Sequence, residues 1–168
     1  MGNAEHGVYF YLGAQDNTVG PDNVIAHNGG DGVRVAGAST TGNAITRNSI
    51  FSNTLGIDLF DGANGSIAPP EIITTTLGSV HVAGTACPGC TVELFTNGDT
   101  DGEGETYVGE DIADGSGAFS ITVTYLDDPY LTATATDAVS GTSEFSAIFT
   151  ATETGYCAVY LPITLRGY

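Results

Sequence analysis

The first sixty residues contain an internal repeat, and this repeat constrains the fold more than any other feature of the sequence. Residues 3–10 match residues 28–35 at a spacing of 25 residues, and a shortened third copy begins at Asn53. Each copy consists of short alternating runs separated by Gly and Asn, without the 3.6-residue period of a helix. Apolar residues recur in columns through the copies: Val8/Val33/Ile57, Phe10/Val35/Leu59, Val19/Ile45 and Ile25/Ile50.

A repeat of this length, built from short strands, predicts coils that stack on one another. Strands in neighbouring coils lie ~4.8 Å apart, so equivalent residues lie directly above each other and the apolar columns fill the interior. Asn3, Asn28 and Asn53 are expected at a bend, where Asn tolerates left-handed backbone and its amide can bond to the next coil. The pattern resembles the right-handed parallel β-helix repeats of pectate-lyase-like surface proteins. That resemblance implies a short parallel β-helix over residues 1–66 but no particular activity.

Seven strand-like runs follow a linker rich in Gly, Asn and Pro. Their Val, Ile, Thr and Tyr content and regular spacing predict an antiparallel β-sandwich. Residues 78–148 are similar to bacterial immunoglobulin-like modules, which implies a spacer or binding module. The predicted fold is therefore all-β, with an Ig-like β-sandwich over residues 67–150 and a tail strand over residues 151–168. The expected strands are residues 71–76, 79–85, 91–96, 106–112, 118–124, 130–136 and 142–150.

Charge excludes several classes of partner. The chain has 20 acidic residues against three arginines and no lysine, for a net charge of −17. Nucleic acids and anionic membranes need clustered basic residues, so we expect neither as a partner. No apolar run approaches the ~18 residues that span a bilayer, so no membrane insertion is expected. Arg34 and Asp58 are expected to be neighbours on adjacent coils, and we interpret them as an ion pair. With no catalytic constellation visible, we expect no enzyme.

One acidic stretch has the pattern of a cation-binding loop. Oxygen-bearing side chains alternate with small residues there, as in turns that wrap a hard cation. The expected Ca²⁺ ligands are Asn97, Asp99, Asp101, Glu103 and Glu105. The other interpretation of this stretch is a solvated acidic loop at the tip of the sandwich.

Three cysteines and one sequon bear on the compartment. Cys87 and Cys90 are spaced for a disulfide across a turn, which fits an oxidising environment, although two reduced thiols remain the other interpretation. Cys157 is expected either to pair between chains or to be a buried thiol. Asn64 begins the one N-glycosylation sequon. Together these features predict an extracellular or cell-surface protein.

The C-terminal tail is the most apolar run of the chain. Pro162 is compatible with an edge strand but not with a central one. At the other end, the first coil leaves strand edges that need either further coils or another molecule to cover them. We therefore expect a homopolymer: a surface fibre assembled head to tail through open β-edges and the tail. The other expectation is a carbohydrate-binding or adhesive module that contacts polysaccharide or the cell surface. The expected assembly residues are Tyr156, Val159, Tyr160, Leu161, Ile163 and Leu165.

Overall fold

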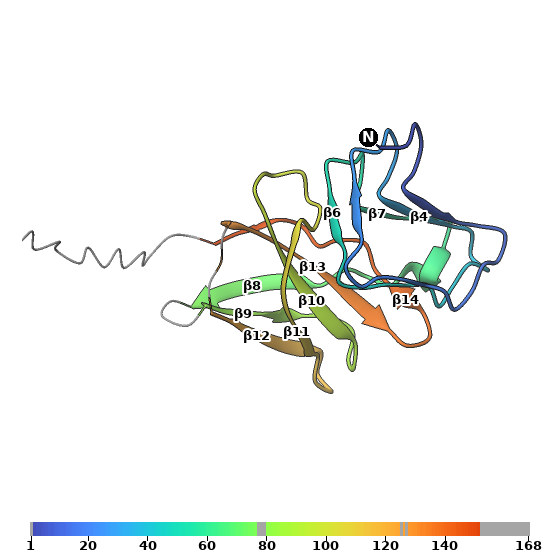
Figure 1. The fold of residues 1–168 in the computed structure, drawn as a ribbon. Helices are drawn as coiled ribbons and strands as arrows, with labels where there is room; N and C mark the ends of the chain where they lie inside the picture. Colours follow the sequence, from blue (N-terminus) through green and yellow to red (C-terminus); the bar gives the residue numbers. More distant parts are fainter. Residues whose placement is uncertain (1, 77–79, 125, 127, 152–168) are drawn as a thin grey trace, which may run out of the picture.

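The computed structural model describes residues 2–76, 80–124, 126 and 128–151. These residues form an all-β protein with three parallel and two antiparallel sheets and one short 3-10 segment, η1 (Ala63–Ser66). Figure 1 shows the parallel sheets (blue to cyan) beside the antiparallel sheets (green to orange). No helix in the described part of the chain is long and apolar enough to cross a membrane.

The parallel sheets are formed by equivalent segments of successive repeats. Val8 pairs with Val33 and Val33 with Ile57, and the other apolar columns expected from the sequence pair in the same way. One sheet has three strands and two have two strands. The three-stranded sheet contains β1 (Val8–Phe10), β4 (Val33–Ala36) and β7 (Ile57–Phe60). The two-stranded sheets contain β2 (Thr18–Val19) with β5 (Ala44–Ile45), and β3 (Val24–Ala26) with β6 (Ser49–Phe51).

The apolar columns fill the interior of the repeats. Val33, Val35 and Ile50 of the second copy are almost completely buried. Their counterparts Val8 and Phe10 in the first copy pack against the same core but are only partly buried. The core is thus covered on the side of the later copies and less covered on the side of the first.

The antiparallel part consists of two sheets that share one core. One sheet has the order β12–β9–β8, and the other has the order β11–β10–β13–β14, with β15 also paired to β13. Side chains of both sheets, such as Val82, Phe119, Leu94 and Leu131, pack in one cluster. The strands are β8 (Glu71–Thr76), β9 (Val80–Thr85), β10 (Thr91–Asn97), β11 (Thr106–Ile112), β12 (Ala118–Val123), β13 (Tyr130–Asp137), β14 (Gly141–Thr142) and β15 (Phe149–Thr150).

The last expected strand, residues 142–150, was predicted wrongly as continuous. It is divided into β14 and β15 by a segment that bonds to β13 partly through side chains. The Ser143 and Ser146 hydroxyl oxygens accept the backbone N–H groups of Ala135 and Ala133, each at 3.0 Å. Serine therefore supplies acceptors that backbone carbonyls would supply in a regular ladder.

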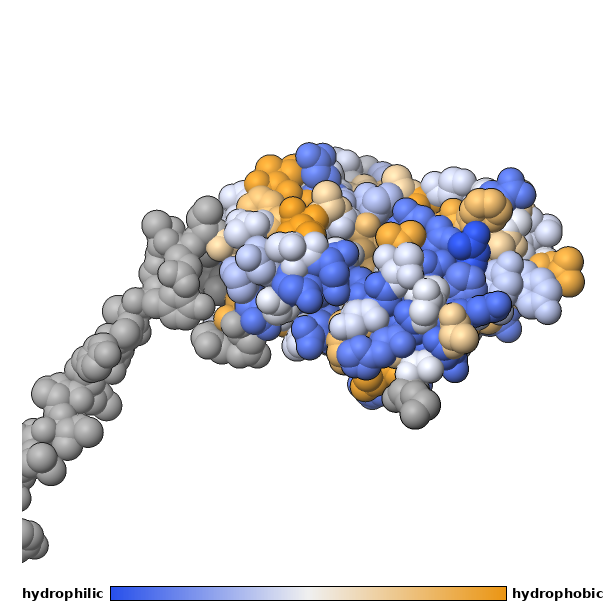
Figure 2. All heavy atoms as spheres, turned by 90° about the horizontal axis from the view of Figure 1, so that it is seen from above, coloured by the Kyte–Doolittle hydropathy of each residue, from blue (hydrophilic) through white to orange (hydrophobic). Residues whose placement is uncertain are grey.

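The surface has no single continuous apolar face on the side seen from above. Figure 2 shows apolar residues distributed among polar ones on that side. The most exposed large apolar side chains, Leu12, Val139 and Val24, come from three separate segments.

Candidate functional site

The stack of repeats has two ends, and the antiparallel sheets cover one of them. We call the end of the stack formed by the sides of β5, β6 and β7 that face away from β2, β3 and β4 the closed end. There Ile50 and Gly104 exchange two backbone hydrogen bonds of 2.8 and 3.0 Å, although 54 positions separate them in the chain. The edge of β6 therefore has a partner from the antiparallel part.

Thr142 covers β5 in a comparable way. The backbone N–H of Ile45 donates to its Oγ1 at 2.8 Å, and this hydroxyl donates to Ile45 O at 3.2 Å. At β7, the N–H of Leu59 donates to Oε1 of Glu144 at 3.0 Å. All three strands at the closed end thus have hydrogen-bond partners from the antiparallel part.

Asparagines at one corner of the repeats form a ladder of hydrogen bonds with a direction. The backbone N–H of Asn3 donates to Oδ1 of Asn28, and the N–H and Nδ2 of Asn28 both donate to Oδ1 of Asn53. Asn53 in turn donates its N–H and Nδ2 to the two carboxylate oxygens of Glu103, each at 2.9 Å. Each Asn accepts and donates, whereas an ionised Glu only accepts. Glu103 therefore ends this ladder.

Two further corners carry ladders of the same direction. Asn17 donates to Asn43, whose backbone N–H donates to Oδ1 of Asn64. At the third corner, Asn23 donates to Oδ1 of Asn48. The predicted bend Asn residues are therefore part of a wider set of three ladders.

The structure is at odds with Asn64 as a glycosylation site. The residue is fully buried, and its Nδ2 donates to the backbone oxygens of Asn43 and Thr142 at 2.9 and 3.0 Å. An N-linked sugar is attached at this nitrogen and needs a surface position. The asparagine of the sequon is instead part of the hydrogen-bond ladder that contains Asn43.

Glu93 is a second buried carboxylate at the closed end. It is only 2% exposed, and it accepts a hydrogen bond from the hydroxyl of Thr46 and another, 2.9 Å long, from the backbone N–H of Arg47. Burial raises the pKa of this carboxyl, and the two hydrogen bonds oppose that effect. The guanidinium of Arg47 bonds Glu110 at 2.6 Å instead, and this bond lowers the pKa of Glu110.

Glu103 is only 1% exposed, so it differs from the solvated acidic residues expected in this stretch of the sequence. Burial raises the pKa of its carboxyl, and the two donors on Asn53 oppose the rise. The side chain faces the repeats and supplies the acceptors that a further Asn would supply in the ladder.

Four of the five expected calcium ligands accept local hydrogen bonds, whereas the carboxylate of Glu103 accepts those of Asn53. Asn97 Oδ1 accepts the N–H of Glu105, Asp99 Oδ1 accepts that of Asp101, and Asp101 Oδ1 accepts that of Glu103. Among the described residues, no group of three or more His, Cys, Asp or Glu side chains could hold a metal ion. Calcium binding at these residues stays a prediction.

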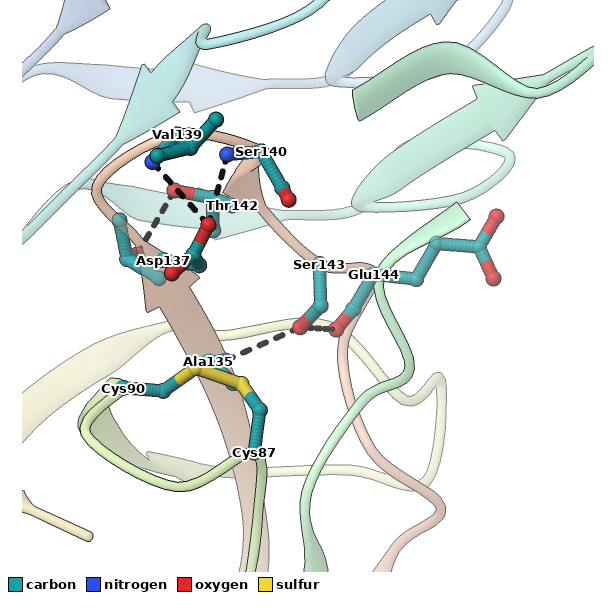
Figure 3. The surroundings of a disulfide bond; sticks show 10 residues. Cys87, Cys90, Ala135, Asp137, Val139, Ser140, Thr142, Ser143 and Glu144 are labelled. Atoms are coloured by element: carbon teal, nitrogen blue, oxygen red, sulfur yellow. Dashed lines mark hydrogen bonds between the residues drawn. A yellow bond between two sulfur atoms is a disulfide. The ribbon is translucent and has the colours of Figure 1, made fainter. Parts of the chain in front are cut away.

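Cys87 and Cys90 form a disulfide across the turn between β9 and β10, drawn in Figure 3. Their Cα atoms are 5.4 Å apart, and the N–H of Cys90 also donates to Cys87 O at 3.1 Å. Figure 3 also shows, in the same region, the hydrogen bond that the backbone N–H of Ala135 donates to Oγ of Ser143. Cys157 and the expected assembly residues of the tail lie outside the described residues.

The outer face of the β1–β4–β7 sheet carries charged and aromatic side chains. Arg34 and Asp58 form the expected ion pair, at 2.6 Å. Arg34 also contacts Asp31 at 3.2 Å, which sequence reasoning missed. Tyr9 and Tyr11, both about half exposed, stack with ring centroids 4.8 Å apart. Arg34 is thus compensated by two carboxylates, and the arrangement is that of a structural ion cluster beside an aromatic pair.

The opposite end of the stack differs from the closed end. We call the end formed by the sides of β1, β2 and β3 that face away from β4, β5 and β6 the open end. In the described part of the chain no strand pairs with these sides, and no group donates to Oδ1 of the three first ladder residues, Asn3, Asn17 and Asn23. The backbone N–H of Val8 donates to Gly32 O at 2.9 Å, so strand alternation directs the N–H and C=O of Tyr9 away from β4.

Comparison with known proteins gives no family for this chain. No protein-family model matches it, and no curated protein matches its sequence.

Proposed function

We propose that this protein is an extracellular structural subunit that self-assembles head to tail into a surface fibre, and that it is not an enzyme. In this proposal the repeats are a short segment of parallel β-helix and the antiparallel sheets are an Ig-like β-sandwich. The single observation that carries the proposal is the difference between the two ends. Strand edges are satisfied by hydrogen bonds at the closed end and unpaired among the described residues at the open end.

Unpaired strand edges favour the addition of another strand. The open end offers three such edges together with the partly buried side chains of Val8, Phe10 and Val19. An added strand would bury these side chains and use the unpaired N–H and C=O groups of β1.

The closed end narrows the possible routes of assembly. Direct stacking of repeats from two chains would need free strand edges at both ends, but Gly104, Thr142 and Glu144 already occupy the closed end. A strand donor available in the sequence is the apolar tail, residues 156–165. A tail from one subunit that pairs with the open end of the next gives a head-to-tail contact, and such contacts produce filaments when they do not close into a ring.

An extracellular location is supported by the disulfide Cys87–Cys90, because disulfides are typical of oxidising compartments. The net charge of −17 with no lysine bears on partners instead, since it is unsuited to nucleic acids or anionic membranes.

Two substitutions at Tyr9 test the proposal with a matched pair. Tyr9→Pro removes the N–H that faces the open side, whereas Tyr9→Ala removes the same side chain and keeps the N–H. We expect the wild type and Tyr9→Ala to sediment as polymers and Tyr9→Pro to sediment as a folded monomer. Circular dichroism controls for folding.

Deleting residues 156–168 tests the donor. We expect the filaments visible by electron microscopy to disappear, while the shortened protein remains folded. A wild type that stays monomeric, or filaments that survive the deletion unchanged, contradicts the proposal.

Carbohydrate binding is the second candidate function, and the aromatic pair on the outer face favours it. Tyr9 and Tyr11 present a stacked and exposed ring surface beside the polar cluster of Arg34, Asp31 and Asp58. Aromatic rings of this kind can stack on sugars. Of the other tyrosines in the sequence, Tyr107 is packed edge-on against Phe95 and is less available. Titration with neutral oligosaccharides, comparing the wild type with Tyr11→Ala, tests this function.

A further inference from the structure

The sequence of the tail and the hydrogen bonds around β1 together predict how the tail would pair with the open end. We infer that residues 159–165 of a second copy add to β1 as a parallel strand, with Val159 above Val8 and Leu161 above Phe10, and that Pro162 weakens the outer edge of that strand. This inference rests on the proposed function and specifies the direction and register of the contact.

The sequence of the tail matches that of the strand it would cover. Residues 159–161 read Val-Tyr-Leu, and residues 8–10 of β1 read Val-Tyr-Phe. In the observed sheet, Val8 and Phe10 lie above Val33 and Val35 in the buried columns, and Tyr9 lies above Arg34 on the outer face. A strand placed one step above β1 continues both columns, with its apolar residues inward and Tyr160 outward. Successive side chains of a strand point to opposite faces, so in the added strand Val159, Leu161, Ile163 and Leu165 would all point inward.

The hydrogen bonds of the observed sheet fix which residues of an added parallel strand must donate. At each step the inward residue donates its N–H towards the next copy. Val8 N donates to Gly32 O, and Val33 N donates to Gly56 O, each at 2.9 Å. A parallel strand above β1 would therefore donate from its inward residues, such as Val159 and Leu161. The N–H groups of its outward residues would point away from β1.

Pro162 falls on an outward position of this strand. Proline has no N–H, and at position 162 a parallel strand needs none for its bonds to β1. An antiparallel strand with the same apolar residues inward has the opposite requirement. Its inward residues would face Val8 and Phe10, whose backbone groups point to β4, and its outward residues would have to bond Tyr9. Residue 162 would then be a required donor position, so the parallel direction is favoured.

The position of Pro162 also affects the outer edge of the added strand. At residue 162 this edge would present a carbonyl without the neighbouring N–H, which weakens it as a template, although Tyr160 would keep its outward N–H. The tail contains no Asn or Gln, so it would not extend the Asn ladders beyond Asn3. The added strand would therefore complete β1 and leave a weaker edge than that of β1.

A proline pair in the tail of the full-length chain tests the direction. Val159→Pro removes an N–H that the parallel strand must donate, whereas Tyr160→Pro removes one that points away. Val159→Ala and Tyr160→Ala control for the lost side chains. We expect Val159→Pro to weaken association by roughly tenfold or more relative to Val159→Ala, as the loss of a backbone hydrogen bond predicts. Tyr160→Pro should associate like Tyr160→Ala. Analytical ultracentrifugation over a concentration series measures both differences.

The outcomes separate this inference from the proposed function. If Tyr160→Pro abolishes polymers and Val159→Pro does not, the tail is the donor but runs antiparallel, so the inference is wrong while the proposed function stands. If all four variants and the tail deletion assemble like the wild type, the tail is not the donor and both are wrong. The protein could also be a monomer in which Val159→Pro lowers the melting temperature relative to Val159→Ala, while Tyr160→Pro does not differ from Tyr160→Ala. In that case the strand comes from the same chain, and the assignment to a second copy is overturned.

Discussion

Glu103 and Asn53 are joined by two hydrogen bonds of 2.9 Å, one from the backbone N–H and one from the side-chain amide of Asn53. The carboxylate takes the place that an asparagine occupies one copy earlier, where Asn53 accepts the same two donors from Asn28. A residue of the antiparallel part thus completes a corner of the repeats.

A double-mutant cycle measures this relationship. Glu103→Ala leaves the backbone N–H of Asn53 without its acceptor and removes one of the acceptors of its Nδ2, which also donates to Ile25 O and Phe51 O. We therefore expect the free energy of unfolding to fall by about 1–3 kcal/mol. Combined with Asn53→Ala, the coupling energy should be roughly 0.5–3 kcal/mol. Urea denaturation of the four proteins gives the value. Asn23→Ala lies on another ladder and is the control, because its effect should add to that of Glu103→Ala within about 0.5 kcal/mol. Full additivity of Asn53→Ala and Glu103→Ala would contradict the pairing.

The buried carboxyls at the closed end predict a pH dependence. Burial raises the pKa of both Glu93 and Glu103, so the folded protein holds these protons more tightly than the unfolded chain does. Their stabilising contribution is complete below the unfolded pKa, about 4.3, and is lost as pH rises through the raised pKa. Glu103→Gln should therefore show a smaller fall in melting temperature between that pH and neutrality than the wild type. Glu71→Gln, at an exposed position, should keep the wild-type slope. Equal slopes for the wild type and Glu103→Gln would rule out this explanation.

Gly141 is required where β14 meets the repeats. Its φ is +99°, and a Cβ there would lie 2.5 Å from Asn43 O and 2.6 Å from Nδ2 of Asn64. We expect Gly141→Ala to lower the free energy of unfolding by roughly 1–3 kcal/mol, from backbone strain and displaced neighbours. Gly115→Ala, where no atom lies within 4 Å of the added carbon, should stay within about 0.5 kcal/mol of the wild type. Similar losses for the two variants in thermal denaturation would argue against a special role of Gly141.

The disulfide closes a small loop, so its removal should have a moderate effect. For a loop of this length, chain entropy predicts a loss of about 2 kcal/mol for the double substitution Cys87→Ser with Cys90→Ser. A reducing agent should lower the melting temperature of the wild type to a similar extent and leave the double variant unchanged. Mass spectrometry after alkylation with and without reduction checks the bond itself. Alkylation of both thiols in the folded, unreduced protein would exclude the disulfide.

The periodic features of the fold could be predicted from the sequence. The columns of Val, Ile and Phe predicted the register of the three parallel sheets, because equivalent residues of successive copies, 24 to 26 positions apart, coincide when the copies stack. The column assignment also placed Arg34 beside Asp58 on the outer face. Alternation of apolar residues likewise indicated the strands around Phe119 and Leu131.

The contacts that close the repeats could not be predicted in the same way. Glu103 lies in an acidic stretch, and composition alone favours solvent or a cation for such residues. Its burial depends on Asn53, 50 positions earlier, and no periodic pattern connects the two. Asn64 was likewise interpreted from a three-residue motif, although its environment is set by Asn43 and Thr142. One signal was present: the third copy ends after Leu59, without strands to follow β5 and β6, so something else had to cover them.

This order of closure matters while the protein is being made. The repeats are synthesised first, but their covering residues, Glu93, Glu103, Gly104, Thr142 and Glu144, come later in the chain. Until residue 144 has left the ribosome, a nascent chain therefore exposes the strand edges of β5, β6 and β7. Once the antiparallel sheets have folded, these edges are covered, so folding of the second half shields this end of the repeats from pairing with other chains.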